Sequence, residues 1–189
     1  MIKRVSFDLD GTIIDSQLSV QNAMFGALLE IGERIECVPP NGESLDNLLN
    51  KLGLTKQIEK NQVKEKFKKL YDTKYCLNTS LYPGILDLLQ QLRRDGFILN
   101  LITNKRQKPT KKIIDHFRLQ SLFENVCCID TLSHCDTKKR IMGEYFHENS
   151  TNIYVGDLYQ DYLAANSSGY KFYHVDTYIL YYLLEVLWE

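Results

Sequence analysis

Apolar residues follow two different spacings along the 189-residue chain, and each spacing predicts one kind of element. Residues 2–10 form an apolar, β-rich run that predicts a buried strand. Between residues 18 and 80 the apolar positions recur at helical intervals, as in Val20, Met24 and Ala27, and no run there favours a strand. The first strand is therefore expected to be followed by a segment made of helices.

Strands and helices alternate in the rest of the chain. The predicted strands are 97–104, 125–130, 152–157 and 171–175, and the predicted helices are 85–92, 109–117, 137–146, 159–169 and 178–188. Such alternation favours parallel strand pairing with right-handed helical crossovers. The last helix is apolar and aromatic, and it is expected either to pack into a groove of the core or to form a dimer contact.

These patterns predict an α/β fold in two parts. The larger part is a Rossmann-like parallel sheet core made of residues 1–16 and 80–189. The smaller part, residues 17–79, is an all-helical domain inserted after the first strand. Such an insert is expected to sit over whatever the first strand presents at its carboxyl end.

Composition and charge narrow the possible partners. The formal net charge is −1, which provides no general attraction to nucleic acid or to an anionic membrane. No apolar run approaches the roughly 20 residues that span a bilayer, and the start of the chain lacks the features of a secretory signal. Five cysteines without a CxxC spacing predict reduced thiols. We therefore expect a cytoplasmic protein whose partners are neither nucleic acid nor membrane, present as a monomer or homodimer.

One segment departs from this even charge. Residues 56–70 carry six lysines and two glutamates, a net charge of +4. The preferred interpretation is a solvated helix face whose buried side is formed by Ile58, Val63, Phe67 and Leu70. The alternative is a basic surface that attracts phosphorylated substrates.

Polar side chains suited to phosphate chemistry follow the predicted strands. Ligands of open parallel sheets bind beyond the carboxyl ends of the strands, so these positions are the ones expected to meet. They are Asp8 and Asp10 after the first strand, Thr103 and Asn104 after the second, Lys138 or Lys139 after the third, and Asp157 with Asp161 after the fourth.

This set of groups has the chemistry of a phosphate-transfer site. Several carboxylates brought together need a cation, and oxygen ligands suit Mg²⁺, which often shares its coordination shell with a phosphate. In an extended strand residues i and i+2 point to one side, so Asp8 and Asp10 are expected to face the same space. One carboxylate could attack phosphorus while the other exchanges protons. Gly11 would let the backbone turn closely beneath the phosphate, and Thr103, the Asn104 backbone and a lysine would hold phosphoryl oxygens.

Four stretches resemble motifs of the haloacid dehalogenase superfamily, in its phosphoglycolate phosphatase-like branch. FDLDGTIIDS (7–16) resembles the first motif, LITNK (101–105) the second, TKKRI (137–141) the third and VGDLYQDYLAANSSG (155–169) the fourth. They occur in the order of that family. The helical insert is then similar to the family's helical cap, and the segment LYPG resembles the return from the cap to the core.

The resemblance implies roles for the acidic residues. Asp8 is implied to be the nucleophile and a Mg²⁺ ligand, and Asp10 the general acid/base whose backbone carbonyl also binds Mg²⁺. Asp157 is implied to bind Mg²⁺, and Asp161 to support the metal directly or through water. An acid at position 10 fits phosphate ester hydrolysis or phosphomutase chemistry.

The resemblance also implies that Thr103 and a lysine hold the phosphoryl group. Lys138 is preferred to Lys139 because it places Ile141 and Met142 at i+3 and i+4, the apolar positions usual for that helix. The function expected is a Mg²⁺-dependent phosphatase that acts on a small phosphorylated metabolite through an aspartyl-phosphate on Asp8. A phosphomutase of the β-phosphoglucomutase type and a non-catalytic protein that binds a phosphorylated ligand are the alternatives.

Overall fold

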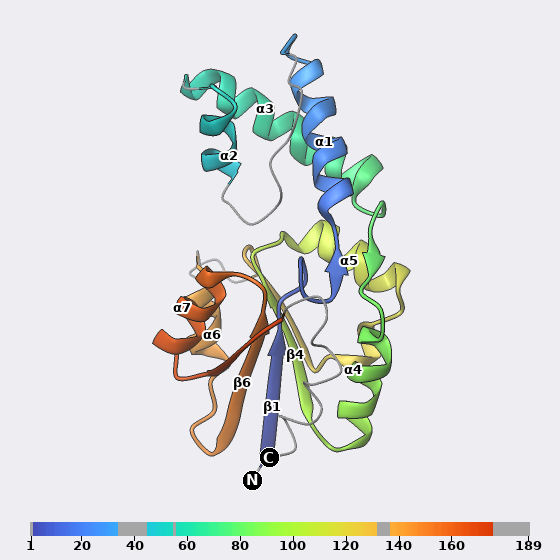
Figure 1. The fold of residues 1–189 in the computed structure, drawn as a ribbon, viewed down its shortest axis with the longest axis vertical. Coiled ribbons are helices and arrows are strands. Elements are labelled where there is room, and N and C mark those ends of the chain that lie inside the picture. Colours follow the sequence, from blue (N-terminus) through green and yellow to red (C-terminus); the bar gives the residue numbers. More distant parts are fainter. Residues whose placement is uncertain (1, 34–44, 55, 132–136, 176–189) are drawn as a thin grey trace. The chain divides into compact units, whose positions relative to one another are not determined.

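The structure is a computed structural model that describes residues 2–33, 45–54, 56–131 and 137–175 (Figure 1). The predicted helix 178–188 lies outside the described residues. The chain divides into two compact units, one made of Met1–Asp15 and Ser80–Glu189 and the other of Ser16–Thr79. Each unit is described by itself, the first as the core unit and the second as the helical unit.

The core unit contains a five-stranded sheet in the order β5-β4-β1-β6-β7. Its strands are β1 (Ile2–Phe7), β4 (Ile98–Thr103), β5 (Asn125–Cys128), β6 (Ser150–Gly156) and β7 (Lys171–His174), and every neighbouring pair is parallel. Strand β1 is central, with Phe7 paired to Leu101 of β4 and to Val155 of β6. The predicted α/β class with a parallel sheet is confirmed, and the carboxyl ends of β1, β4 and β6 meet at one edge.

Helices cover both faces of this sheet (Figure 1). They are α4 (Ile85–Arg94), α5 (Gln107–His116), α6 (Lys138–Glu144) and α7 (Tyr159–Ser167), with a short 3₁₀ turn at Gln120–Leu122. Alternate strand residues serve opposite faces. Leu101 packs in the cluster that contains residues of α4 and α5, whereas Ile102 packs in the cluster that contains Ile141 of α6 and Ala165 of α7. Both faces are thus buried, as a parallel sheet requires.

A second, two-stranded sheet joins the outgoing and returning chain. Strand β2 (Ile14–Asp15) pairs antiparallel with β3 (Ser80–Leu81), and Asp15 lies opposite Ser80. The two points where the chain leaves and re-enters the core unit therefore lie side by side. Neither strand was predicted, because two residues carry no periodic pattern.

The helical unit consists of α1 (Gln17–Leu29), α2 (Leu45–Lys51), α3 (Gln57–Leu70) and a turn of π-helix at Tyr71–Tyr75. Its described residues contain no strand. Its core contains Met24, Leu49 and Val63. The expected burial of Ile58 is wrong, since this side chain is 74% exposed, and Lys60 is buried in its place with its Nζ donating to the Oδ1 of Asn50.

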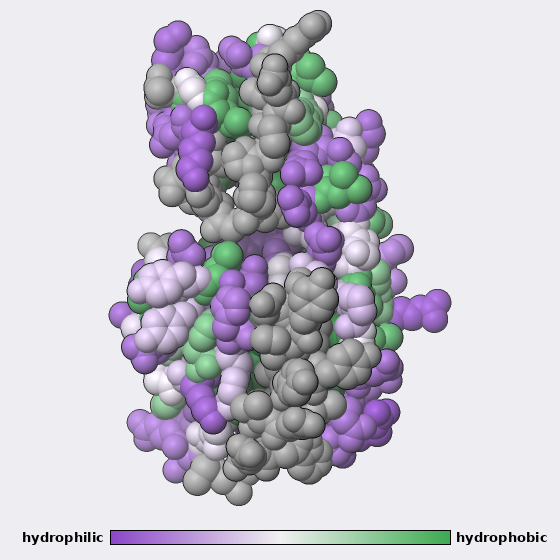
Figure 2. Space-filling model, in the orientation of Figure 1, coloured by the Kyte–Doolittle hydropathy of each residue, from purple (hydrophilic) through white to green (hydrophobic). Residues whose placement is uncertain are grey.

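Hydrophilic residues occupy much of the visible face of both units, with smaller hydrophobic areas between them (Figure 2). In the part of the chain that the structure describes, no helix is both long and apolar enough to cross a membrane. The free thiols of Cys76, Cys127 and Cys128 are buried, as reduced cysteines commonly are.

Candidate active site

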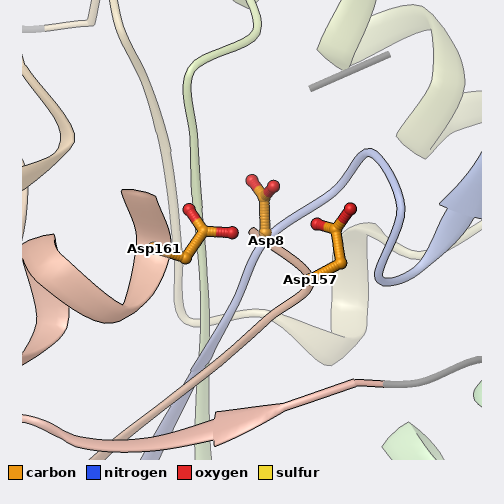
Figure 3. A group of neighbouring side chains, drawn as sticks. All are labelled: Asp8, Asp157 and Asp161. Carbon is orange, nitrogen blue, oxygen red and sulfur yellow. The ribbon is translucent and has the colours of Figure 1, made fainter. Parts of the chain in front are cut away.

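Three carboxylates converge at the carboxyl edge of the sheet (Figure 3). Asp8 follows β1, Asp157 follows β6 and Asp161 lies in the first turn of α7, and each offers an oxygen within 4.8 Å of the others. The pairing of β1 with β6 brings the first two together, since the Asp8 N–H donates to the Val155 carbonyl at 2.9 Å. We call these three residues the acidic cluster. Its formation follows from strands that end side by side.

Two glycines make room for the acidic cluster. Gly11 has a φ of +77°, and a Cβ added there would lie 2.0 Å from the Oδ2 of Asp157. A Cβ on Gly156 would lie 2.6 Å from the Oδ2 of Asp161. The turn expected at Gly11 is therefore present, and the glycine also leaves the space that the Asp157 carboxylate fills. Contact of Gly11 with a phosphate stays a prediction.

Lys138 is the cation of this cluster. Its Nζ lies 3.1 Å from the Oδ1 of Asp8 and 2.5 Å from the Oδ1 of Asp161, and its side chain is 5% exposed. It is the first residue of α6, whose N-cap Thr137 accepts a hydrogen bond from the Arg140 N–H. Lys139 is exposed. Of the two lysines that the sequence left open, the structure therefore brings Lys138 to the carboxylates.

The surroundings of the acidic cluster disfavour ionisation. Burial raises the pKa of Asp8 from 3.8 to about 6, and repulsion from Asp161 and Asp10 adds to this rise while Lys138 opposes it. Burial and then repulsion from Asp8 and Asp161 raise the pKa of Asp157 to about 7. Three carboxylates facing one ammonium thus leave negative charge that is not offset.

A divalent cation fits this donor set. The donors are all carboxylate oxygens, which Mg²⁺ prefers. The Oδ1 of Asp8 is buried and, among the described residues, receives no hydrogen bond of good geometry; its contact with Lys138 is an ion pair. A cation would satisfy such oxygens and favour the ionised form of Asp8 and Asp157.

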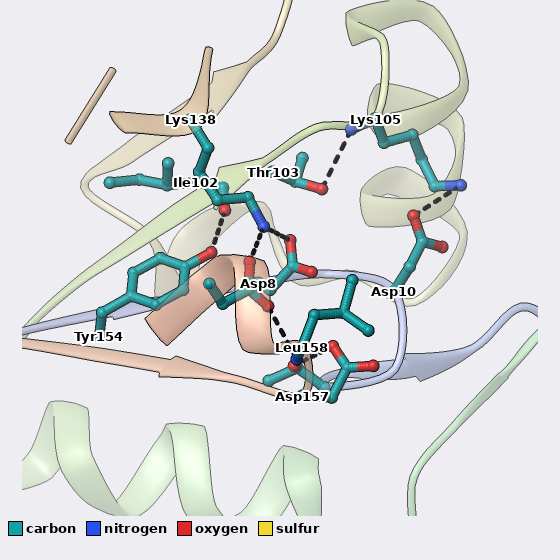
Figure 4. Close-up of polar contacts among 11 residues, drawn as sticks. Asp8, Asp10, Ile102, Thr103, Lys105, Lys138, Tyr154, Asp157 and Leu158 are labelled. Atoms are coloured by element: carbon teal, nitrogen blue, oxygen red, sulfur yellow. Dashed lines mark hydrogen bonds and ion pairs between the residues drawn. The ribbon is translucent and has the colours of Figure 1, made fainter. Parts of the chain in front are cut away.

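Asp10 lies apart from the acidic cluster (Figure 4). Its Oδ2 is 2.9 Å from the Nζ of Lys105, and its carboxylate is not among the three grouped oxygens. The expectation that Asp8 and Asp10 face the same space assumed a strand running through residue 10. Strand β1 ends at Phe7, and Asp10 lies in the turn, bridged to Ile14, so strand alternation alone does not place the two carboxylates. The two still interact, since repulsion from Asp10 contributes to the raised pKa of Asp8, and their facing one space stays a prediction. The predicted contact of the Asp10 backbone carbonyl with a metal stays a prediction.

Lys105 is a site residue that the sequence reasoning missed. It is the last residue of the LITNK segment, in which the sequence predicts a role only for Thr103 and Asn104. Its N–H donates to the Thr103 Oγ1 at 3.2 Å, so the side chain leaves the end of β4 next to the predicted phosphoryl ligand. A lysine two residues beyond a strand-end threonine was the available signal.

The remaining predicted residues also lie at this edge. Thr103 is buried at the end of β4, whereas Asn104 is exposed. Asn104 lines a pocket of about 440 Å³ together with Lys138 and Asp161. Asn104 and Lys138 therefore line one pocket, while the Thr103 hydroxyl accepts a hydrogen bond from the Lys105 N–H.

Comparisons with known proteins agree with this geometry. A family model described as haloacid dehalogenase-like hydrolase matches residues 5–175. A phosphoglycolate phosphatase of Mannheimia succiniciproducens is 27% identical over 186 residues, and the match covers 88% of this chain and 82% of that protein. A phosphoglycolate phosphatase of Pseudomonas fluorescens is 30% identical over 185 residues, and the match covers 88% of this chain and 66% of that protein. The crystal structure of a predicted phosphatase from Clostridium acetobutylicum has the same fold, with a TM-score of 0.80 at 22% identity over 94% of this chain and 86% of that one.

Proposed function

Because the chain belongs to the haloacid dehalogenase-like hydrolase family, we propose that it hydrolyses a small phosphorylated metabolite through an aspartyl-phosphate on Asp8, with Mg²⁺ as cofactor. The family and the curated phosphoglycolate phosphatases that match the chain make it a phosphoric monoester hydrolase. The proposal adds the metal, the intermediate and the role of each residue. The single observation that carries it is the acidic cluster, in which the buried Asp8 and Asp161 both contact Lys138.

Asp8 is the nucleophile in this proposal. A carboxylate oxygen of Asp8 forms a bond to phosphorus while the bond from phosphorus to the ester oxygen breaks. Asp10 gives the departing oxygen a proton, then takes one from the water that attacks the aspartyl-phosphate, which releases phosphate and restores Asp8. Asp10 is 29% exposed at its side chain, so it keeps a face from which protons can be exchanged.

The other residues hold the phosphoryl group and the cofactor. Asp8, Asp157 and Asp161 would bind Mg²⁺, with Asp161 contributing directly or through water, and the ion would offset the charge between carboxylate and phosphate. The Lys138 ammonium, already beside Asp8, would contact a phosphoryl oxygen. The Thr103 hydroxyl, the Asn104 N–H and the turn at Gly11 would complete the phosphate cradle.

The substrate class follows from the curated relatives, which carry the name phosphoglycolate phosphatase. A small phosphate monoester is therefore the substrate proposed for this chain. The helical unit, residues 16–79, is proposed to act as the cap that contributes to the choice of the leaving group.

The test is phosphate release from a panel of esters that includes phosphoglycolate, sugar phosphates, nucleotides and p-nitrophenyl phosphate. Wild type is expected to release phosphate with Mg²⁺ and not with EDTA. Asp8→Asn should lose this activity. Its matched control is Asp87→Asn, which changes an exposed carboxylate on α4 and should keep full activity. No release from any ester would overturn the proposal in favour of a binding protein, and transfer of phosphate to a second sugar phosphate rather than to water would indicate a phosphomutase.

A further inference from the structure

The charged residues at the carboxyl edge of the sheet fall into two separate groups. In one, the acidic cluster contacts Lys138. In the other, Asp10 contacts Lys105. Figure 4 shows the two ammonium groups on different sides of Thr103. The family resemblance implies a role in holding the phosphoryl group for Lys138, and it implies no role for Lys105.

Lys105 is fixed from three directions. Its N–H donates to the Thr103 Oγ1 at 3.2 Å, and its carbonyl accepts from the Ile129 N–H at 3.3 Å. These bonds tie its backbone to the ends of β4 and β5. Its side chain is only 8% exposed, and its Nζ lies 2.9 Å from the Oδ2 of Asp10. A buried ammonium is costly unless it is paired, so this geometry favours one direction for the Lys105 side chain.

Asp10 is more exposed than Lys105. It lies in a turn after β1, with a side chain that is 29% exposed. Asp8 is two residues away, and a cation bound by the acidic cluster would attract any carboxylate nearby. The Lys105 ammonium offers the Asp10 carboxylate a competing partner on the other side.

We propose that Lys105 is a positioning residue for the general acid/base. It holds the Asp10 carboxylate away from the acidic cluster, so that Asp10 is directed to the leaving oxygen instead of becoming a further metal ligand. The inference rests on the proposed function, because it needs a leaving oxygen for Asp10 to protonate. It assigns a role to a lysine that neither binds the metal nor contacts the nucleophile.

The test uses leaving groups of different basicity. When the bond from phosphorus to the ester oxygen breaks, an alkoxide needs the proton of Asp10, whereas p-nitrophenolate leaves without one. The ratio kcat/KM includes only the steps up to departure of the leaving group, so it isolates this event. For Lys105→Met we expect kcat/KM to fall by about 30-fold or more with an alkyl phosphate, and by less than about threefold with p-nitrophenyl phosphate.

Three further variants make the result specific. Lys111→Met removes an exposed lysine of α5 that is paired with Asp115. This variant should keep the wild-type kcat/KM with both substrates. Lys105→Arg keeps a cation near Asp10 and should restore part of the alkyl phosphate activity. Because Lys105 acts through Asp10, adding Lys105→Met to Asp10→Asn should cause little further loss.

The ratio between the kcat/KM values for the two substrates does not depend on how much of a variant is folded, because misfolded protein lowers both kcat/KM values by the same factor. Equal losses with both esters, or a raised KM for both at unchanged kcat, would overturn the inference by showing a structural or substrate-binding role. If wild type is active and Lys105→Met has the wild-type kcat/KM with both esters, the role of Lys105 is overturned and the proposed function is not. A wild type that hydrolyses none of the esters would overturn the proposed function and the inference with it.

Discussion

The carboxyl edge of the sheet and the helical unit differ in how deeply their ion pairs are buried. At the sheet edge Asp8 and Asp161 are buried, and both contact the buried Lys138. In the helical unit the ion pairs lie at the surface, as between Lys66 and Glu30, whose side chains are 36% and 47% exposed. The same residue types therefore occur in two very different environments within one chain.

This difference separates charges that serve a site from charges that keep a surface hydrated. A surface pair costs little to form and stabilises little. A buried set of carboxylates with raised pKa values opposes folding, so it persists only where another requirement selects it. The sheet edge contains carboxylates whose pKa values are raised by burial, and the lysine-rich helix α3 does not. The four predictions below test how far this contrast extends.

The largest effect is expected from Asp8→Asn. Loss of the nucleophile should reduce turnover by on the order of 10³-fold or more. Removing one of three mutually repelling carboxylates should at the same time raise the thermal midpoint of the metal-free protein. Steady-state hydrolysis and thermal unfolding in EDTA measure the two effects. Multiple-turnover hydrolysis at near wild-type rate, or a lowered midpoint, would contradict the assignment of Asp8 to a functional rather than a stabilising cluster.

A second effect concerns the space beneath Asp157. Gly11→Ala places a Cβ 2.0 Å from the Oδ2 of Asp157, in a residue with φ of +77°. Gly96→Ala is the matched control, since Gly96 has φ of +82° and no atom within 4 Å of an added Cβ. Both should pay about 1 to 2 kcal/mol of unfolding free energy for the left-handed backbone. Only Gly11→Ala should also displace Asp157 and weaken activation by Mg²⁺, measured as the Mg²⁺ concentration at half-maximal rate. Equal Mg²⁺ dependence in the two variants would show that Asp157 does not need this space.

The parallel sheet could be predicted from sequence because buried strands leave long apolar runs. All five strands of the large sheet were expected within a few residues of their observed ends, for example 152–157 against Ser150–Gly156. The strands β2 and β3 were not, since each has two residues. Ile58 was placed in the core on spacing alone, whereas the buried position is taken by Lys60, whose Nζ reaches Asn50.

The candidate site divides in the same way. Asp8 and Asp157 could be predicted because they follow strands that pair side by side, and Asp161 because it comes four residues after Asp157. Separation of Asp10 from this cluster depends on β1 ending at Phe7, and a boundary of two or three residues is beyond what a pattern specifies. Contact with Lys105 depends on the direction of one long side chain, which no periodicity records.

A third, smaller effect is the pH dependence of stabilisation by Mg²⁺. Without metal, the pKa of Asp8 is raised to about 6 and that of Asp157 to about 7, above the ordinary value of 3.8. The folded state therefore holds protons that the unfolded state has lost, and this contribution to stability is present below about pH 4 and is lost as the pH rises through 6 and 7. Binding of Mg²⁺ needs the ionised carboxylates, so its stabilisation should grow over the same range.

The measurement is the difference in thermal midpoint between Mg²⁺ and EDTA, at pH 5 and at pH 8. A larger difference at pH 8 is expected for wild type and for Asp87→Asn, whose exposed carboxylate lies on α4. Asp157→Asn should show a smaller difference in thermal midpoint between Mg²⁺ and EDTA at both pH 5 and pH 8. A shift that is independent of pH would mean that the acidic cluster does not bind the ion.

The smallest effect is expected at the surface of the helical unit. Lys66 lies 2.8 Å from Glu30, and its hydrogen bond is the main cause of the lowered pKa of Glu30. The stabilising contribution of this pair is present above the ordinary pKa of Glu30 and is lost as the pH falls through the lowered value. Lys66→Gln should therefore lower the thermal midpoint slightly at pH 7, and the difference from wild type should disappear in high salt, because exposed charges are screened. Activity and its Mg²⁺ dependence should not change. A loss of activity in this variant would instead support the alternative raised by the lysine-rich sequence, that the basic face of α3 attracts the phosphorylated substrate, and the contrast between functional and merely hydrated charges would then have to include the helical unit.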